Sequence, residues 1–131
     1  MNHKPMVIIS AIFVLLHAIM EISGLFFLFI PPGAYESPRF YLEWLNKNVA
    51  LSILIGVSAG LIRLTTFIGL LKNKLWAGKM VIYMSIITYA SAPLYLPFGA
   101  VDVILTTPPF ILMTILLNRG KKLSDSYPDN P

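Results

Sequence analysis

Apolar residues run through this chain in four long blocks, which are separated by short polar stretches. The blocks cover residues 6–30, 49–71, 75–92 and 99–118. None of them has a polar face wide enough for a helix that lies against water. At 1.5 Å per residue, a helix of about 20 residues crosses a hydrocarbon core of about 30 Å. The pattern therefore predicts an all-α fold, a bundle of four transmembrane helices, with the lipid bilayer as its solvent.

The composition agrees with this pattern. Of the 131 residues, 56% are hydrophobic and 12% are charged, whereas about 25% are charged in an ordinary soluble domain. We expect residues 1–123 to form a single membrane domain and the polar residues 124–131 to form a disordered cytoplasmic tail. The first block is longer than the apolar run of about 7–15 residues in a signal peptide, so it is expected to remain as a span.

The basic residues outside the membrane are unequally divided between its two sides. With four spans, seven Lys and Arg residues fall on one side and two on the other. The larger group is Lys4, Lys72, Lys74, Lys79, Arg119, Lys121 and Lys122, and the smaller is Arg39 and Lys47. Because basic residues in short loops favour the cytoplasmic side, both termini are predicted to be cytoplasmic. The membrane itself is expected to be the plasma membrane of a prokaryote. These residues orient the chain and meet anionic headgroups, so no nucleic-acid partner is expected.

The loop between the first two blocks contains a predicted short amphipathic helix. Ser37 and Pro38 are typical of an N-cap and a first helical position. The following apolar stripe is Phe40, Tyr41, Trp44 and Leu45, with Arg39, Glu43 and Lys47 on the other side. We expect this interfacial helix in the first outer loop to be an aromatic anchor or, alternatively, a lid over a cavity between the spans.

Besides Lys79, which belongs to the cytoplasmic end of its block, four ionisable side chains lie inside the predicted spans, namely His17, Glu21, Arg63 and Asp102. Such groups cost about 2.5–3.5 kcal/mol on insertion scales and usually face the bundle interior or a wet cavity. His17 and Glu21 are one helical turn apart and share a face. From the helix rise, Glu21 and Asp102 lie at about one height and Arg63 lies near His17. Arg63 is expected either to reach outward to Glu21 or to snorkel inward.

The third and fourth blocks add uncharged polar groups to this intramembrane polar cluster. Tyr89 lies near the estimated height of Glu21, and Thr106 follows Asp102 by one turn. The Pro108-Pro109 pair removes two backbone donors and is predicted to kink or break the last span. The candidate cluster residues are therefore His17, Glu21, Arg63, Tyr89, Asp102 and Thr106.

With a neutral His17 the candidate cluster carries one surplus negative charge. Protonation of a carboxyl group, charging of His17 or a cationic ligand would each compensate this charge. A buried ionic network that sets the helix packing is the alternative to a ligand site. In the second block Ser52, Gly56 and Gly60 share a face with Arg63 and predict a close helix-packing seam.

No catalytic signature occurs in the sequence. Cysteine is absent, which excludes disulfides and thiolate chemistry. Phosphate loops, nucleophile elbows and dinucleotide fingerprints do not occur either. His17 and Glu21 form only an i, i+4 pair, and a third metal ligand would have to come from Asp102. We therefore expect no catalytic residue, no metal and no cofactor.

Two segments carry a resemblance to a known kind of protein. They are GLLKNKLWAGKM, from Gly69 to Met80, and PFGAVDVIL, from Pro97 to Leu105. With the order of the blocks, they make the chain similar to small four-helix membrane proteins of the DoxX-like type and related uncharacterised families. The resemblance implies a four-helix architecture. It also implies that Trp76 and Asp102 are the positions that this chain shares with those families.

Three functions remain as hypotheses. The first is a non-enzymatic accessory or oligomerising membrane component, with a homo-oligomer or another membrane protein as its partner and a structural ionic cluster. The second is a proton- or cation-coupled small carrier or hydrophobic-ligand binder that works as a dimer, because four helices are few for a complete carrier. The third and weaker one is a lipid-modifying enzyme with His17 and Glu21 as an acid/base pair.

Overall fold

The computed structural model describes residues 3–29, 31 and 42–119. These residues form helices and no strand, so that the described part of the chain is all-helical. The elements are, in order, α1 (His3–Ser23), η1 (Gly24–Leu28), α2 (Glu43–Lys47), α3 (Val49–Leu71), α4 (Leu75–Ser91), η2 (Ala92–Tyr95) and α5 (Phe98–Asn118). The predicted tail, residues 124–131, lies outside the described residues.

Three of the described helices are long and apolar enough to cross a membrane. They cover Lys4–Leu28, Val49–Leu71 and Phe98–Asn118. The third predicted block forms α4, which has 17 residues and is therefore about 26 Å long. The described residues thus form three candidate membrane-spanning helices and one shorter helix beside them.

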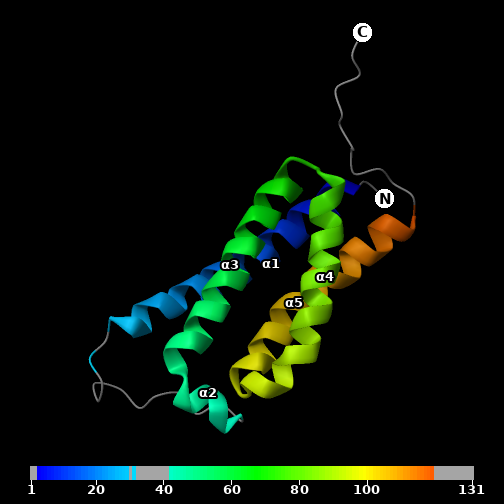
Figure 1. The fold of residues 1–131 in the computed structure, drawn as a ribbon. Helices are drawn as coiled ribbons and strands as arrows, with labels where there is room; N and C mark the ends of the chain where they lie inside the picture. Colours follow the sequence, from blue (N-terminus) through cyan, green and yellow to red (C-terminus); the bar gives the residue numbers. More distant parts are fainter. Residues whose placement is uncertain (1–2, 30, 32–41, 120–131) are drawn as a thin grey trace.

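The four long helices form a closed ring of contacts. α1 packs against α3 and α5, and α4 packs against the same two helices from the other side. In Figure 1, α3 and α4 run side by side, whereas α1 crosses the bundle obliquely. Each long helix therefore has two long neighbours, and polar side chains on their inner faces can meet.

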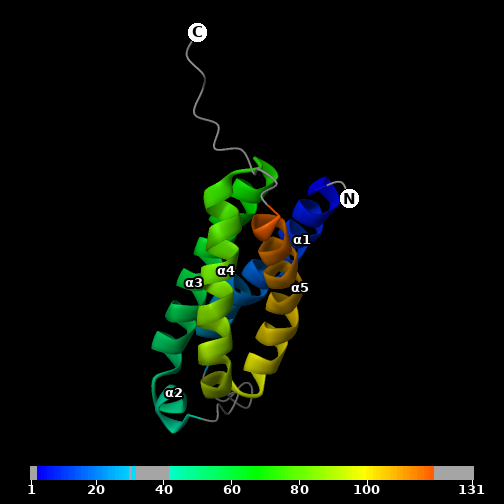
Figure 2. The same ribbon diagram turned by 90° about the vertical axis from the view of Figure 1, so that its right-hand side faces the viewer.

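The two ends of the bundle differ in charge. One end holds the start of α1, the α3–α4 turn and the end of α5, as Figures 1 and 2 both show. We call it the basic end, since it carries Lys4, Lys72, Lys74 and Arg119. The opposite end, which we call the α2 end, holds α2 and the connection from α4 to α5. Lys121, Lys122 and Arg39, which the charge count includes, lie outside the described residues.

The α3–α4 turn folds α4 back onto α3. Asn73 has a φ of 55°, a left-handed conformation that asparagine tolerates better than most residues. The N–H of Lys74 donates to the carbonyl of Gly69 at 2.9 Å, and the N–H of Asn73 donates to that of Leu70 at 2.9 Å. These two bonds form a Schellman C-cap. An ideal Cβ on Gly69 would lie 2.6 Å from Trp76 Cζ2, so only glycine permits the helices to meet this closely.

The bundle interior has a mainly apolar half and a polar half. The apolar half, toward the basic end, consists of Met6, Val7, Ala11, Val14, Leu70, Ala77, Val81, Met113 and Leu116, all buried, together with the buried hydroxyl residues Ser10 and Thr66. The outer faces are apolar as well: Ile8, Ile12, Leu16 and Ile19 of α1 are each about half exposed. Side chains of this kind are stable on an outer face when lipid surrounds the helix.

Two local predictions concern the last span and the first loop. α5 continues through Pro108 and Pro109 without interruption, so of the two predicted outcomes the break does not occur, and the kink stays a prediction. Proline fits helical φ values, and neighbouring helices and side chains support the turn within a membrane bundle. In the loop, α2 is helical over Glu43–Lys47, and the start of the predicted interfacial helix at Ser37 lies outside the described residues.

Candidate functional site

His17 lies at the centre of the polar half of the bundle. Only 2% of its surface is exposed. Its Nε2 atom lies 3.1 Å from Asp102 Oδ1 and 3.6 Å from Glu21 Oε1. Its Nδ1 atom lies 3.2 Å from Thr106 Oγ1. The ring therefore contacts oxygen atoms on both of its nitrogens and joins α1 to α5.

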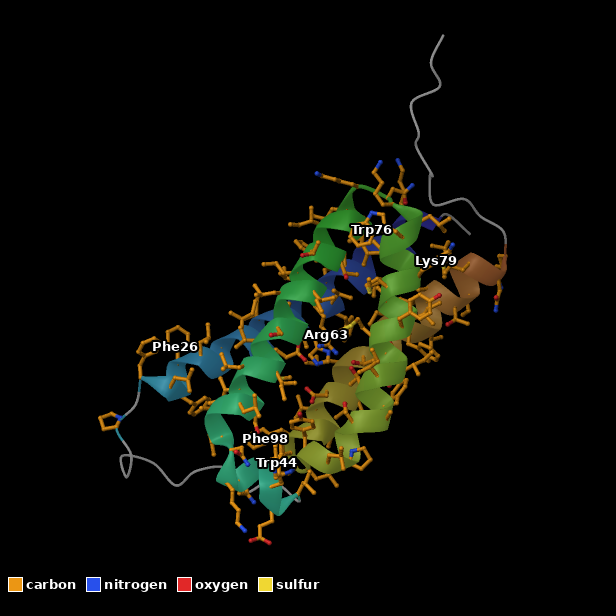
Figure 3. All side chains as sticks on the ribbon, viewed as in Figure 1. Phe26, Trp44, Arg63, Trp76, Lys79 and Phe98 are labelled. Carbon is orange, nitrogen blue, oxygen red and sulfur yellow. The ribbon has the colours of Figure 1, made fainter. Side chains whose placement is uncertain are left out.

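Arg63 joins three helices. Its Nη1 donates to Glu21 Oε1 of α1, and its Nη2 donates to Thr88 Oγ1 of α4 at 2.6 Å. The side chains of Arg63 and Glu21 are 7% and 14% exposed. Figure 3 shows Arg63 deep between α3 and α4, with Trp76 near one end of the bundle and Trp44 near the other. Of the two expected directions, Arg63 takes the one that leads to Glu21.

Thr88 is the member of the network that the candidate set omits. Its hydroxyl accepts from Arg63 and donates to the carbonyl of Met84 at 2.8 Å. Ser85, one turn earlier, is also buried and donates to the carbonyl of Val81 at 2.6 Å. A face of α4 with hydroxyl residues three positions apart is the signal in the sequence that could have identified Thr88.

The structure therefore brings six side chains from four helices into one polar cluster. They are His17, Glu21, Arg63, Thr88, Asp102 and Thr106. Two carboxylates and one guanidinium leave one negative charge when His17 is neutral, and none when His17 is protonated. An uncompensated charge in a low-dielectric interior is costly, so the protonation of this cluster sets the electrostatic state of the bundle centre.

Tyr89 lies apart from this cluster. Its hydroxyl donates to Thr107 Oγ1 at 3.0 Å, and its ring packs edge-on against Phe110 with centroids 5.6 Å apart. Adjacent residues of an α-helix are rotated by about 100°. Because Thr88 faces Arg63, Tyr89 faces α5 instead. The height estimated for Tyr89 equals that of Glu21, but the side chain of Tyr89 lies on another face of α4, away from the cluster.

The predicted packing residues behave differently from one another. An ideal Cβ on Gly60 would lie 2.8 Å from Ile22 Cγ1 and 3.1 Å from Ala18 O, so this glycine permits the close approach of α1 and α3. A Cβ on Gly56 would meet nothing within 4 Å. Ser52 is buried, and its hydroxyl donates to the carbonyl of Asn48 at 3.1 Å. Of the three predicted packing residues, Gly60 is therefore the one that permits a close contact between α1 and α3.

A small cavity lies where the polar and apolar halves meet. Its volume is about 20 Å³, which is close to the minimum for one water molecule. The lining residues are Val14, His17, Arg63, Thr66, Val81, Met84, Ser85, Leu105, Thr106 and Pro109. The cavity is too small for a lipid or another organic ligand.

Within the described part of the chain, neither a metal-binding geometry nor a similarity to a known protein identifies a function for this site. Among the described residues, no group of three His, Asp or Glu side chains is placed to hold a metal. No protein-family model, curated protein or solved structure matches this chain. The DoxX-like resemblance therefore stays a prediction, and the function has to be inferred from the site itself.

Proposed function

We propose that the chain is a four-span integral membrane protein that acts as a non-enzymatic accessory or oligomerising component. In this proposal the polar cluster is structural and holds the four long helices in one arrangement. The interaction that supports it best is the connection of α1, α3 and α4 through the single guanidinium of Arg63, with α5 joined through His17.

The fourth span in this proposal is α4 extended by η2. The 17 residues of α4 cover about 26 Å, and the four residues of η2 add about 8 Å at the rise of a 3₁₀-helix. The sum reaches the thickness of a hydrocarbon core of about 30 Å. Two spanning helices, α3 and α5, also flank α4 along its length.

The orientation in this proposal follows from the basic end. Lys4, Lys72, Lys74 and Arg119 lie together there, whereas Lys47 at the α2 end pairs with Glu43 at 2.9 Å. Positive charges near span ends are retained in the cytoplasm, so the basic end and both termini are cytoplasmic. Labels fused to the N-terminus and the C-terminus test the span number, because four spans place both labels on one side and three spans place them on opposite sides.

The tight pairing of the cluster favours a structural role over ligand binding. The cavity beside it holds about one water molecule, and most polar atoms of the cluster have partners within the protein. Glu21→Gln and Arg63→Gln should therefore lower the thermal stability of the protein in detergent. Wild-type stability in both variants would contradict the structural role.

The second candidate function is a proton- or cation-coupled carrier that works as a dimer. One observation favours it: the side chain of Asp102 is 23% exposed although it contacts the buried His17, so the cluster has an accessible member. Gly56, with open space beside its Cα, offers α3 a place for a close helix contact between two copies. A pH gradient that drives no solute uptake into proteoliposomes, with Asp102→Asn as the matched control, would exclude this candidate.

A further inference from the structure

We infer that the outer face of α4 near the basic end is a binding site for an anionic phospholipid, whose phosphate group pairs with Lys79. The inference rests on the proposed insertion of the bundle in a membrane, and it does not depend on the accessory role. Its basis is the order of side chains along this face, the position of the described carboxylates and the contrast with the other outer faces of the bundle.

The outer face of α4 carries a cation and two aromatic side chains. Trp76, Lys79 and Tyr83 are separated by three and four positions and therefore lie on one side of the helix. All three are exposed, Trp76 at 46% and Tyr83 at 61%. The buried residues of α4 occupy the opposite side, namely Ala77, Gly78, Val81, Ser85 and Thr88. The three exposed side chains therefore point away from the bundle.

These side chains lie at increasing depth along α4. By the helix rise, Lys79 and Tyr83 are about 6 and 12 Å from the first residue of the helix, Leu75. Side chains of a helix tilt toward its N-terminus, which for α4 lies toward the basic end, and Figure 3 shows Trp76 and Lys79 on that half of the helix. The stem of Lys79 thus lies along apolar surface while its ammonium group reaches the headgroup region.

A phospholipid presents its chemical groups in the same order. Its phosphate is outermost, its ester groups follow, and its acyl chains fill the hydrocarbon core. Lys79 supplies the charge for the phosphate, and the hydroxyl of Tyr83 is a donor for an ester carbonyl. Ile86 and Ile87, 54% and 59% exposed, continue the same side of α4 toward the acyl chains. Tryptophan and tyrosine are also the residues favoured at this boundary of a membrane.

The described carboxylates lie far from this face. They belong to Glu21, Glu43 and Asp102. Glu21 and Asp102 are members of the polar cluster, and Glu43 pairs with Lys47 at the α2 end. In the part of the chain that the structure describes, Lys79 therefore has no carboxylate partner, and an anionic lipid supplies the opposite charge.

The other outer faces carry no comparable cation. Away from the ends of α1 and α5, the exposed side chains are apolar, among them Ile8, Ile9, Ile12, Leu16, Ile19, Val101, Ile104, Ile111 and Ile115. α3 exposes Ser58 and Thr65, whose hydroxyls donate to carbonyls of their own helix. A charged side chain is costly against plain hydrocarbon, so the face of α4 is the one that fits a charged headgroup.

The fluorescence of Trp76 tests this site. The chain has two tryptophans, and Trp44→Phe leaves Trp76 as the reporter. The protein is placed in vesicles of phosphatidylglycerol and phosphatidylcholine, and bromine, which quenches an adjacent indole, is carried by the acyl chains of one lipid at a time. We expect brominated phosphatidylglycerol to quench Trp76 more strongly than brominated phosphatidylcholine at equal mole fraction. Trp76→Phe leaves Trp44 at the α2 end as the control, where this preference should be absent.

Two matched variants assign the preference to Lys79. Lys79→Gln should lower it about fivefold, the contribution of one cation near an anionic membrane surface. Lys4→Gln removes the same charge from the basic end, but on α1, whose neighbours are α3 and α5, and it should leave the preference at Trp76 unchanged. Equal quenching by the two lipids, or an equal loss in Lys4→Gln and Lys79→Gln, would overturn the site.

Two further outcomes separate this inference from the proposed membrane arrangement. If neither lipid quenches Trp76 but both quench Trp44, a protein such as a second copy of the chain covers this face, and the inference fails while the arrangement stands. If neither tryptophan is quenched, neither end of the bundle meets lipid, and both fail.

Discussion

Arg63 and Glu21 form an ion pair between α3 and α1 in which the two side chains are only 7% and 14% exposed. The two residues are 42 positions apart in the chain. Loss of one partner leaves the other charge in the bundle without compensation, and water screens that charge little.

A double-mutant cycle measures this relationship. Glu21→Gln and Arg63→Gln should each cost about 3 kcal/mol of unfolding free energy, whereas the double variant should cost less than the sum, because it leaves neither charge unpaired. Thermal unfolding in detergent gives the three values. The exposed pair of Lys47 with Glu43 is the control, and Lys47→Gln should cost no more than about 1 kcal/mol. Strict additivity of the two buried changes would show that the pair is not coupled.

Thr88 should matter as an acceptor for Arg63. Thr88→Val keeps the shape of the side chain and removes the oxygen that lies 2.6 Å from Nη2. A buried donor without an acceptor costs about 1–3 kcal/mol. Thr65→Val is a matched control on α3, since Thr65 is exposed and donates to the carbonyl of Leu61 of its own helix. Equal stability of the two variants would mean that Arg63 does not depend on Thr88.

Gly60 and Gly56 offer a matched pair on one helix. Gly60→Ala places a methyl group 2.8 Å from Ile22 Cγ1 and 3.1 Å from Ala18 O, and overpacking of this kind costs about 1–3 kcal/mol. Gly56→Ala meets nothing within 4 Å and should be neutral or stabilise the isolated protein by up to about 1 kcal/mol. Unfolding of both variants in detergent distinguishes these expectations. A larger loss for Gly56→Ala would instead place a helix contact at that position.

Tyr89 should behave as a packing residue independent of the polar cluster. Tyr89→Phe removes the hydrogen bond to Thr107, and such bonds between membrane helices contribute about 0.6 kcal/mol. The ring contact with Phe110 is retained. Combined with Arg63→Gln, the effect should be additive, because Tyr89 contacts Thr107 and Phe110 rather than a residue of the cluster. A coupling above about 0.5 kcal/mol would contradict this separation.

The helices were more predictable than their contacts. The second apolar block, residues 49–71, has the bounds of α3, because long apolar runs without breakers specify a helix locally. The third block, residues 75–92, forms α4, which ends at Ser91, whereas Pro108-Pro109 leaves α5 unbroken. The continuity of α5 does not follow from its local sequence, because neighbouring helices can support a helical turn that contains proline.

The polar cluster shows the same division. The cost of ionisable groups in lipid pointed to His17, Glu21, Arg63 and Asp102, and the helix rise gave their approximate heights. The choice between Thr88 and Tyr89 depended on the rotation of α4 about its axis. Adjacent residues differ by about 100° in direction, and a sequence does not define which face meets a partner from another helix.

From the sequence alone it followed that the apolar blocks form helices, that the long ones are apolar enough to cross a membrane and that the few charges within them face the bundle interior. These properties depend on hydropathy and helix periodicity, which are local. That Arg63 binds Glu21 and Thr88, and that His17 contacts Asp102 and Thr106, is visible in the tertiary structure alone. Those contacts join residues from different helices, and their geometry depends on how the helices cross and rotate against one another.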